Sequence, residues 1–315
     1  MSGGPEQDSN EASTSPGDAF QALADDVRVA VLRTLDADGP LSFSELHAES
    51  GVDTSAGFAY HLRQLDGLYV RQGDDDRYEL TAAGRDAIRT VSAGTYTDSV
   101  ERDPIELAEA CPFCAETALV ATVSDNVTEV ACEDCSSPVL GLSLPPSAYA
   151  DRDPETVPDA LDAYHRRRIA SFDDGVCPDC GGAVDASVES VTDTGDDDPS
   201  RVQAAFDCEV CGASLRCPVA LTVLDHPAVV SFYHDHGVDL SDRPLWNVGS
   251  EWGERLLSES PWCLAVSARL DDERLSLYVA RDGTVAEHRR RPIERDGEAS
   301  PESDRSGAVD DGATA

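Results

Sequence analysis

Four Cys-x2-Cys pairs are the feature that most restricts how this chain can fold. Eight of its ten cysteines belong to these pairs, which form two units of two pairs each. Two thiolates separated by two residues on a tight turn can point at one position, and a second such turn completes a tetrahedron around a metal ion. The sequence therefore predicts two four-thiolate metal sites, made by Cys111, Cys114, Cys132 and Cys135 and by Cys177, Cys180, Cys208 and Cys211.

We expect zinc in both sites. Proline or glycine occurs at three of the four turns, and runs that read as hairpin strands lie between the pairs, at 119–123 and 127–131 and at 183–188 and 202–206, so the units resemble zinc ribbons. Four thiolates leave no open position on zinc for water or substrate. Both ions are therefore expected to be structural, and the chain is not expected to be an enzyme. Disulfide bonds, iron–sulfur clusters and redox chemistry are the alternatives to zinc.

The charge of the chain is strongly acidic. Its 315 residues include 62 Asp and Glu against 24 basic residues, all of them arginine, for a formal net charge of −38. A compact chain with this much like charge repels itself, and molar salt, with a Debye length of ~3 Å, removes most of that penalty. The composition resembles that of an extreme halophile such as an archaeon, so the charge describes the solvent more than the binding partner.

No part of the sequence predicts contact with a membrane. The longest largely apolar runs, such as 219–224, are far shorter than the ~18–20 residues that span a bilayer. The first residues lack the charged-then-apolar pattern of a signal peptide. Because 40% of the residues are hydrophobic, packed cores are expected, and we expect a folded cytoplasmic protein.

The N-terminal region has the element order of a small DNA-binding domain. Apolar residues recur at helical spacing within about 18–38, a short second helix is expected within 42–51, and a third within 54–66. Strand-like runs in 68–80 flank a turn rich in Asp, and Thr81 can cap a fourth helix that ends near 91. Three helices, a hairpin and a helix predict a winged helix-turn-helix.

Three stretches of this region resemble ArsR-type transcription regulators. Residues 23–32 resemble the opening helix of that family, 60–65 its recognition helix, and 78–84 the junction between its wing and last helix. The resemblance covers 18–92 and implies a regulator that binds double-stranded DNA as a homodimer, through the first helix and the region after Val91. The family's metal-sensing cysteine pair is absent from this region.

Helix geometry selects the residues that would face DNA. If Leu62 is the buried centre of the third helix, steps of ~100° per residue put Tyr60, Gln64 and Gly57 opposite it, with Ala56 and Arg63 beside them. Arginine and glutamine can read base edges, and arginines on the wing would lie near phosphates. The predicted DNA-binding residues are Ala56, Gly57, Tyr60, Arg63, Gln64, Arg71 and Arg77.

A protein-interaction scaffold that does not bind DNA is the alternative function. Residues 18–92 hold 7 Arg against 14 Asp and Glu, whereas most DNA-binding domains are net positive. Such a scaffold would dock protein partners, for instance the transcription machinery. In molar salt, however, counterion release is weak and cations could bridge carboxylates to phosphates, so DNA-binding regulation is the first hypothesis.

The chain is expected to be a multidomain α+β protein. In its C-terminal region we expect a helix within 226–237, with Val229, Val230 and Tyr233 inward, and three strands that form a small sheet. Two runs of three arginines, 166–168 and 289–291, are expected to pair with carboxylates. The predicted division has a disordered tail at 1–17, the winged helix at 18–95, a zinc-ribbon region at 96–225, an α+β region for sensing or partner binding at 226–293, and a disordered acidic tail at 294–315. Within the zinc-ribbon region, a helix at 158–172 is expected to join the ribbons 111–135 and 177–211.

The acidic composition predicts that the fold depends on salt. Dilution from molar KCl to about 0.1 M lengthens the Debye length to ~10 Å, so the carboxylates repel one another over longer distances. Loss of the far-ultraviolet circular dichroism signal and of DNA binding on dilution is expected, the reverse of a basic DNA-binding protein. A cooperative fold that persists in dilute buffer would contradict the halophilic interpretation.

Overall fold

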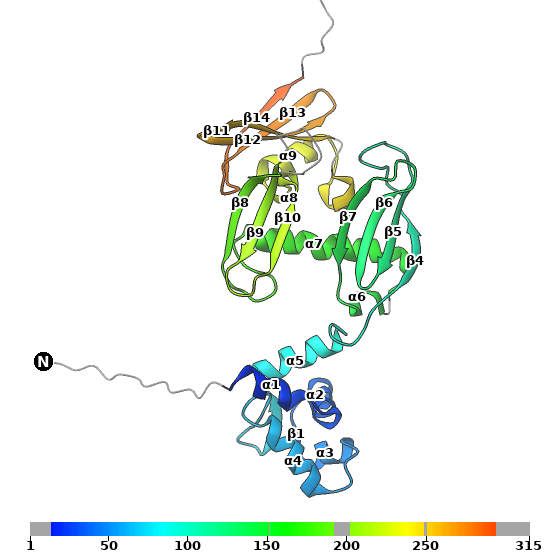
Figure 1. Ribbon diagram of the computed structural model, residues 1–315, viewed down its shortest axis with the longest axis vertical. Coiled ribbons are helices and arrows are strands. Elements are labelled where there is room, and N and C mark those ends of the chain that lie inside the picture. The colour runs from blue at the N-terminus through cyan, green and yellow to red at the C-terminus, as the bar shows by residue number, and fades with distance from the viewer. Residues whose placement is uncertain (1–13, 151, 192–201, 249–250, 294–315) are drawn as a thin grey trace, which may run out of the picture. The chain divides into compact units, whose positions relative to one another are not determined.

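The computed structural model describes residues 14–150, 152–191, 202–248 and 251–293, in which N-terminal helices are followed by β-sheets (Figure 1). The first of two compact units comprises the residues up to Ile105 with 122–128 and 141–157. The second comprises 106–121, 129–140 and the residues from Pro158 onward. Residues 1–13 and 294–315, which make up most of the expected disordered tails, lie outside the described residues. The expected tail at 1–17 extends too far, because Pro16 and Gly17 already belong to the first helix.

The N-terminal part of the first unit packs five helices and a small sheet around one core. The sheet has the order β1-β3-β2 with antiparallel pairing. The core includes Leu35, Leu46, Phe58, Leu62 and Ile88, each at most 4% exposed. The elements are α1 Pro16–Leu23, α2 Asp26–Asp38, β1 Leu41–Ser42, α3 Phe43–Glu49, α4 Ser55–Leu65, β2 Val70–Gln72, β3 Arg77–Leu80 and α5 Ala82–Ser92.

The expected first helix consists of two helices. Ser15 is the N-cap of α1, and its hydroxyl accepts a hydrogen bond from the Asp18 amide. Asp25 then caps α2, because its carboxylate accepts from the amides of Val27 and Arg28. An aspartate that bonds the following amides favours a helix start over helix interior, which explains the break that apolar spacing alone does not show.

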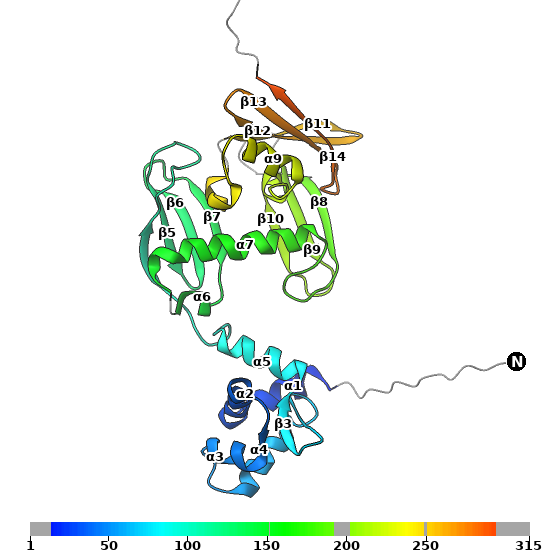
Figure 2. The same cartoon turned by 180° about the vertical axis from the view of Figure 1, so that it is seen from behind.

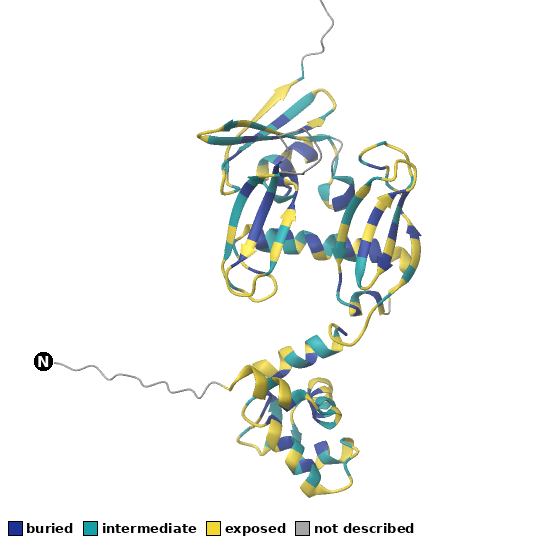
Figure 3. Cartoon of the chain, viewed as in Figure 1, coloured by how far each residue is buried: buried dark blue, intermediate teal, exposed yellow. Residues whose placement is uncertain are grey.

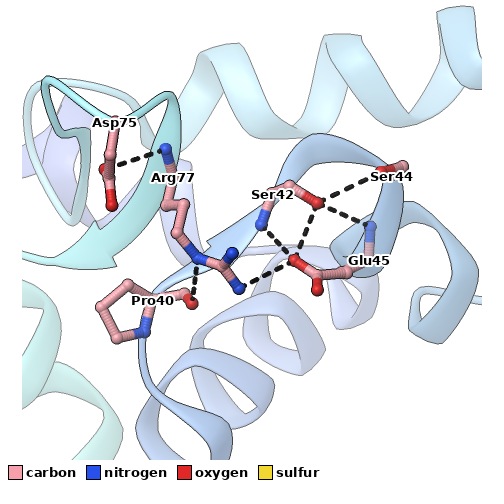
Figure 4. Close-up of polar contacts among 6 residues, drawn as sticks. All are labelled: Pro40, Ser42, Ser44, Glu45, Asp75 and Arg77. Carbon is pink, nitrogen blue, oxygen red and sulfur yellow. Dashed lines mark hydrogen bonds and ion pairs between the residues drawn. The ribbon is translucent and has the colours of Figure 1, made fainter.

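Arg77 ties strand β3 to the start of α3. Its guanidinium donates from Nε to the Pro40 carbonyl at 2.9 Å and lies 3.1 Å from the Glu45 carboxylate (Figure 4). The same carboxylate accepts from the Ser42 amide at 2.7 Å, and the Ser42 hydroxyl accepts from the Glu45 amide, which completes a capping box. These bonds, with that from the Ser42 amide the largest contribution, lower the pKa of Glu45. The carboxylate of Glu45 thus connects the hairpin to the start of α3.

A four-stranded sheet with the order β4-β5-β6-β7 carries the first cysteine unit. The sequence predicted its two central strands but not the outer two, which contain proline or glycine and lack clear alternation. In the first unit, the Thr128 and Tyr149 hydroxyls share a buried hydrogen bond of 2.8 Å. The elements are β4 Arg102–Glu106, β5 Leu119–Ser124, β6 Val127–Cys132, β7 Pro138–Ser143, α6 Ser147–Ala150 and η1 Pro154–Thr156.

The second unit joins the second cysteine unit and the C-terminal residues in one core. Phe206 of β9, Phe232 of α9 and Leu277 of β13 belong to the same buried cluster, so the expected boundary between 225 and 226 lies inside a core. The sheets have the orders β10-β9-β8 and β11-β12-β13-β14 (Figure 2). The elements are α7 Val157–Asp173, β8 Val184–Ser190, β9 Val202–Cys208, β10 Ser214–Cys217, α8 Val219–Thr222, α9 Pro227–Asp235, η2 Leu240–Asp242, η3 Leu245–Asn247, β11 Trp252–Glu259, β12 Trp262–Leu270, β13 Glu273–Val279 and β14 Val285–Pro292.

The helix and three strands expected after residue 225 are present, and β11 adds a strand that was not predicted. Val229 and Tyr233 of α9 are buried as expected, but Val230 is 49% exposed, so the expected inward position of Val230 is wrong. A step of ~100° turns the helix face from one residue to the next, which places Val230 beside rather than within the apolar stripe. No helix in the described part of the chain has the length and apolarity needed to cross a membrane.

Gly84→Ala is predicted to destabilise the N-terminal part of the first unit. A Cβ at Gly84 would lie 2.0 Å from the backbone oxygen of Tyr69, so the α5 backbone would have to shift, at a cost of roughly 1–3 kcal/mol. Amide hydrogen exchange of residues 18–92 in the full chain measures the free energy of local opening.

Gly17→Ala is the matched control. Gly17 lies in α1, where the nearest atom to an added Cβ is the Ser15 Oγ at 3.9 Å, and alanine there should be neutral or stabilising by up to about 1 kcal/mol. Equal exchange protection in the two variants would contradict the close approach at Gly84.

Candidate metal centres and nucleic-acid interface

The structure brings together the two sets of four cysteines that the sequence predicted. In each set the four sulfur atoms lie within 4.8 Å of one another. The Sγ atoms of Cys111 and Cys135 are 3.8 Å apart and those of Cys177 and Cys211 are 3.7 Å apart. A tetrahedral site with Zn–S bonds of ~2.3 Å has S–S edges of about 3.8 Å, so both clusters have the dimensions needed to hold a metal ion.

All four Cys-x2-Cys turns repeat one backbone pattern. The amide of the first cysteine donates to the carbonyl five residues later at Cys111, Cys132, Cys177 and Cys208, at 2.8 to 3.0 Å. Backbone amides also point at sulfur, since the Phe113 amide donates to the Cys111 Sγ at 3.4 Å and the Gly182 amide to the Cys180 Sγ at 3.3 Å. Amide donors stabilise thiolates, which are the form that binds a metal.

The residue after each second cysteine has a left-handed backbone. Its φ is 65° at Ala115, 57° at Ser136, 72° at Gly181 and 74° at Gly212. Glycine adopts this conformation without steric cost, whereas alanine and serine do not. The glycines that marked the turns of the second cluster in the sequence therefore have a backbone function, and the first cluster builds the same turns from residues that sequence reasoning did not single out.

One thiol in each cluster ionises readily. Hydrogen bonds from the Ser137 side chain and amide lower the pKa of Cys135 to about 6. Amide hydrogen bonds, chiefly from Cys211 and then from Val210, lower the pKa of Cys208 to about 6. These donors belong to the turns themselves, so the turns that gather the sulfurs also favour the charged form of Cys135 and Cys208.

The two remaining cysteines lie outside the clusters. Cys217 is buried at the end of β10, and burial raises the pKa of its thiol to about 12. Cys263 is half-buried on β12. Neither belongs to a group of potential metal ligands among the described residues.

The first cluster is bonded to the C-terminal part of the second unit. The Trp246 indole donates to the Glu109 carboxylate at 3.3 Å, and the Asn247 side chain donates to the Ala110 carbonyl at 2.8 Å. Glu109 and Ala110 immediately precede Cys111. The buried Trp246 therefore anchors the chain that enters the first cluster.

The predicted DNA-binding residues lie on helix α4 and on the β2–β3 hairpin. Thr54 caps α4, and Phe58, Leu62 and Leu65 are its buried side chains. Tyr60 is 54% exposed, and Figure 3 shows exposed positions along α4. On α4, Ala56, Tyr60, Arg63 and Gln64 are exposed and Gly57 is half-buried, while Arg71 is exposed on β2 and Arg77 is half-buried on β3.

The two hairpin arginines already have carboxylate partners. Arg71 lies 2.8 Å from Glu79 on the neighbouring strand, and Arg77 has the structural bonds to Pro40 and Glu45 described above. Arg63, by contrast, has no ion pair in the described part of the chain. Among the three arginines predicted to contact DNA, Arg63 is thus the one whose guanidinium is available to a partner.

The prediction that both arginine runs pair with carboxylates is confirmed for most of their members. Arg166 pairs with Asp162 and Arg168 with Asp179. In the second run, Arg290 pairs with Glu273 and Asp235, and Arg289 with Glu287. Arg167 donates to the Ala163 carbonyl instead, and Arg291 makes no ion pair within residues 251–293 or the other described ranges.

Sequence reasoning missed a gathering of arginines on one face of the sheet β11–β14. A hollow of about 700 Å³ lies on this face. The signal was present as arginines at alternate positions of several strands, but it becomes visible only when the pairing of the strands is known. We call this site the arginine hollow; it is lined by Arg255, Arg269, Arg274, Tyr278, Arg289 and Arg291, with small residues between them.

Comparison with known proteins finds two family models and no curated protein that matches. Residues 16–91, which hold α1 to α5, match the model described as Domain of unknown function (DUF7347). Residues 108–285, which hold both cysteine clusters and β11 to β13, match the model described as Domain of unknown function (DUF7351). No curated protein matches the chain. Because the second match covers more than half of its residues, the chain belongs to the DUF7351 family.

Proposed function

We propose that this protein is a DNA-binding transcription regulator of the ArsR-like winged helix-turn-helix type, acting as a homodimer. The observation that carries the proposal is the order α3, α4, β2, β3, with polar side chains exposed on α4. In a winged helix the second helix of the turn enters the major groove and the hairpin lies along the backbone. Helix α4 and the β2–β3 hairpin occupy these two places in the chain.

Helix α4 is suited to present its side chains because it is rigidly held. Its buried side chains Phe58, Leu62 and Leu65 are at most 3% exposed. Arg63 and Gln64 are exposed on the other side and make no side-chain hydrogen bond within the described residues. Arginine can bond guanine and glutamine adenine in the major groove. These two residues are therefore our assignment for base reading.

We assign zinc to both cysteine clusters, with a structural role. Four thiolates at distances near 3.8 Å fit tetrahedral zinc, and they leave no coordination position for a substrate. Zinc would hold turns that have little hydrophobic core of their own. The region that carries the clusters and the C-terminal sheet would then sense a signal or bind a partner, and the proposal includes no enzymatic step.

A scaffold that does not bind DNA is the second candidate. The ion pairs of Arg71 and Arg77 favour it, because two of the arginines assigned to phosphate are already neutralised. The excess of Asp and Glu over Arg in residues 18–92 also favours the scaffold. The two candidates differ in whether Arg63 and Gln64 contact DNA, which a substitution experiment decides.

The metal assignment predicts about two zinc ions per chain. Elemental analysis of the purified full chain after dialysis in molar KCl should give this ratio. Cys111→Ser should remove one ion from the first cluster and Cys177→Ser one ion from the second, because three thiolates bind less strongly than four. Cys263→Ser is the control and should retain both ions. Zero zinc in the unsubstituted chain, or loss of metal in the control, would refute the assignment.

The DNA-binding proposal predicts that Arg63→Ala weakens binding to a selected site by about tenfold or more, the effect of losing one bidentate base contact. The site is obtained by footprinting in molar KCl upstream of the protein's own or neighbouring genes. Affinity is then measured by gel shift with zinc-loaded full chain.

Arg167→Ala is the matched control for charge. Arg167 is exposed on α7, and its guanidinium bonds only a carbonyl of its own helix, so its loss should leave DNA affinity within about twofold. Regulation and binding that survive Arg63→Ala combined with Gln64→Ala would favour the scaffold. Folded, zinc-loaded protein that protects no DNA would exclude the regulator.

A further inference from the structure

The arginine hollow places arginines from three neighbouring strands directly opposite one another. Arg269 of β12 pairs in register with Arg274 of β13, and Arg274 pairs with Arg291 of β14. Directly opposed residues of an antiparallel sheet project on the same face, with Cβ atoms about 5 Å apart. Like charges in this arrangement are destabilising, so a row of three guanidinium groups requires compensation.

Among the described residues, no carboxylate forms an ion pair with Arg269, Arg274 or Arg291. Within the described ranges, Arg255, Arg269, Arg274 and Arg291 make no ion pair, although acidic residues outnumber arginines by 62 to 24 in the whole chain. Glu254 also lines the hollow, but its carboxylate accepts a hydrogen bond from the Ala220 amide on the other side of the sheet. Four of the five arginines that line the hollow are therefore without an ion pair among the described residues, and the fifth, Arg289, pairs with Glu287.

Arg290 of β14, on the opposite face of this sheet, forms ion pairs with carboxylates. Arg290 lies between Arg289 and Arg291 and projects from the opposite face, because side chains alternate along a strand. Its guanidinium pairs with both Glu273 and Asp235. On the hollow face of the same strand, Arg289 pairs with Glu287, whereas Arg291 makes no ion pair among the described residues.

Arg274, at the centre of the row, has a buried donor without a partner. Its Nε has almost no solvent contact and no hydrogen-bond acceptor in the part of the chain that the structure describes. A buried unsatisfied donor costs about 1–3 kcal/mol. An acceptor that enters the hollow would satisfy this atom and neutralise the row of charges at the same time.

The floor of the hollow leaves room for such a ligand. Gly253, Ser267 and Ser276 form the next cross-strand row, and Ser276 is opposite Arg289. Tyr278 lies beside them, with the Arg289 guanidinium 5.5 Å from the centre of its ring. Small side chains surrounded by long cationic ones give a basin, and a volume of about 700 Å³ is in the range of small-molecule sites.

We propose that the arginine hollow binds a compact phosphate-bearing molecule of nucleotide size. Guanidinium groups donate paired, short hydrogen bonds to phosphate oxygens, and such contacts are less sensitive to molar salt than long-range attraction is. The row of three arginines fits several adjacent phosphate groups, and Tyr278 offers a face on which a planar ring can stack. The volume of about 700 Å³ is that of a small-molecule site, which favours a small anion over a long polymer.

This inference extends the proposed function by giving the C-terminal region a ligand class, but it does not require DNA binding. It rests on β11 to β14 alone, and its test contains no operator DNA. Loss of DNA binding in the Arg63 variant and loss of anion binding in a hollow variant are therefore separate results.

The test is calorimetric titration of zinc-loaded full chain in molar KCl, with thermal unfolding followed by tryptophan fluorescence. The probes are ATP, inorganic phosphate, citrate and a short thymidine oligonucleotide. ATP is expected to bind and to raise the unfolding temperature more than citrate. Arg274→Gln should weaken ATP binding by about tenfold or more. It should not lower the unfolding temperature of the free protein, because it breaks no ion pair and removes one like charge.

Two further variants separate ligand binding from folding. Arg290→Gln removes the same charge from the opposite face, so it should lower the unfolding temperature but keep ATP affinity within about twofold. Ser276→Glu supplies a carboxylate on the floor of the hollow, so it should raise the unfolding temperature and abolish ATP binding.

Several outcomes would overturn the proposal. One is that ATP and phosphate give neither heat of binding nor a shift in the unfolding temperature. Others are that citrate binds as tightly as ATP, or that Arg274→Gln and Arg290→Gln lose ATP affinity equally. The last is that only the oligonucleotide binds. The last result would make the face a surface for single-stranded nucleic acid.

Discussion

The gathering of eight cysteine sulfur atoms at two points is the constraint on which the second unit depends. Strands β8 and β9 of the second cluster contribute Val188, Ala204 and Phe206 to the same core that receives Leu277 from the C-terminal sheet. The turn after β9 carries Cys208 and Cys211, so the position of that strand is set at one end by sulfur and along its length by packing. The arginine hollow lies on the far side of the sheet that this core supports.

Electrostatics divides the arginines into groups with different tasks. Arg77 and Arg290 bond carboxylates and hold elements together, and in partly exposed positions each such pair adds little stability by itself. Arg63 on α4 and Arg274 in the hollow are among the arginines that make no ion pair in the described residues. What distinguishes Arg274 is its position between Arg269 and Arg291 and its buried Nε without an acceptor.

Sequence patterns predicted the features that depend on local spacing. The cysteine clusters, helix α4 with its buried Leu62, and strands β12 and β13 follow from periodicity and motif spacing alone. The break between α1 and α2 was missed because it depends on hydrogen bonds of the Asp25 side chain rather than on apolar spacing. The apolar pattern did not predict β11, and the pairing of Arg269, Arg274 and Arg291 depends on register, which a linear reading does not provide.

The two clusters differ in what their turns require of the backbone. The second has glycine at both left-handed positions, so its turns are relaxed whether or not a metal is bound. The first holds Ala115 and Ser136 there, at φ 65° and 57°. With zinc bound as proposed, part of its binding free energy would be used to maintain these two conformations, so a chelator would empty the first cluster before the second. The region around Cys111 would then become the point where metal starvation first loosens the protein.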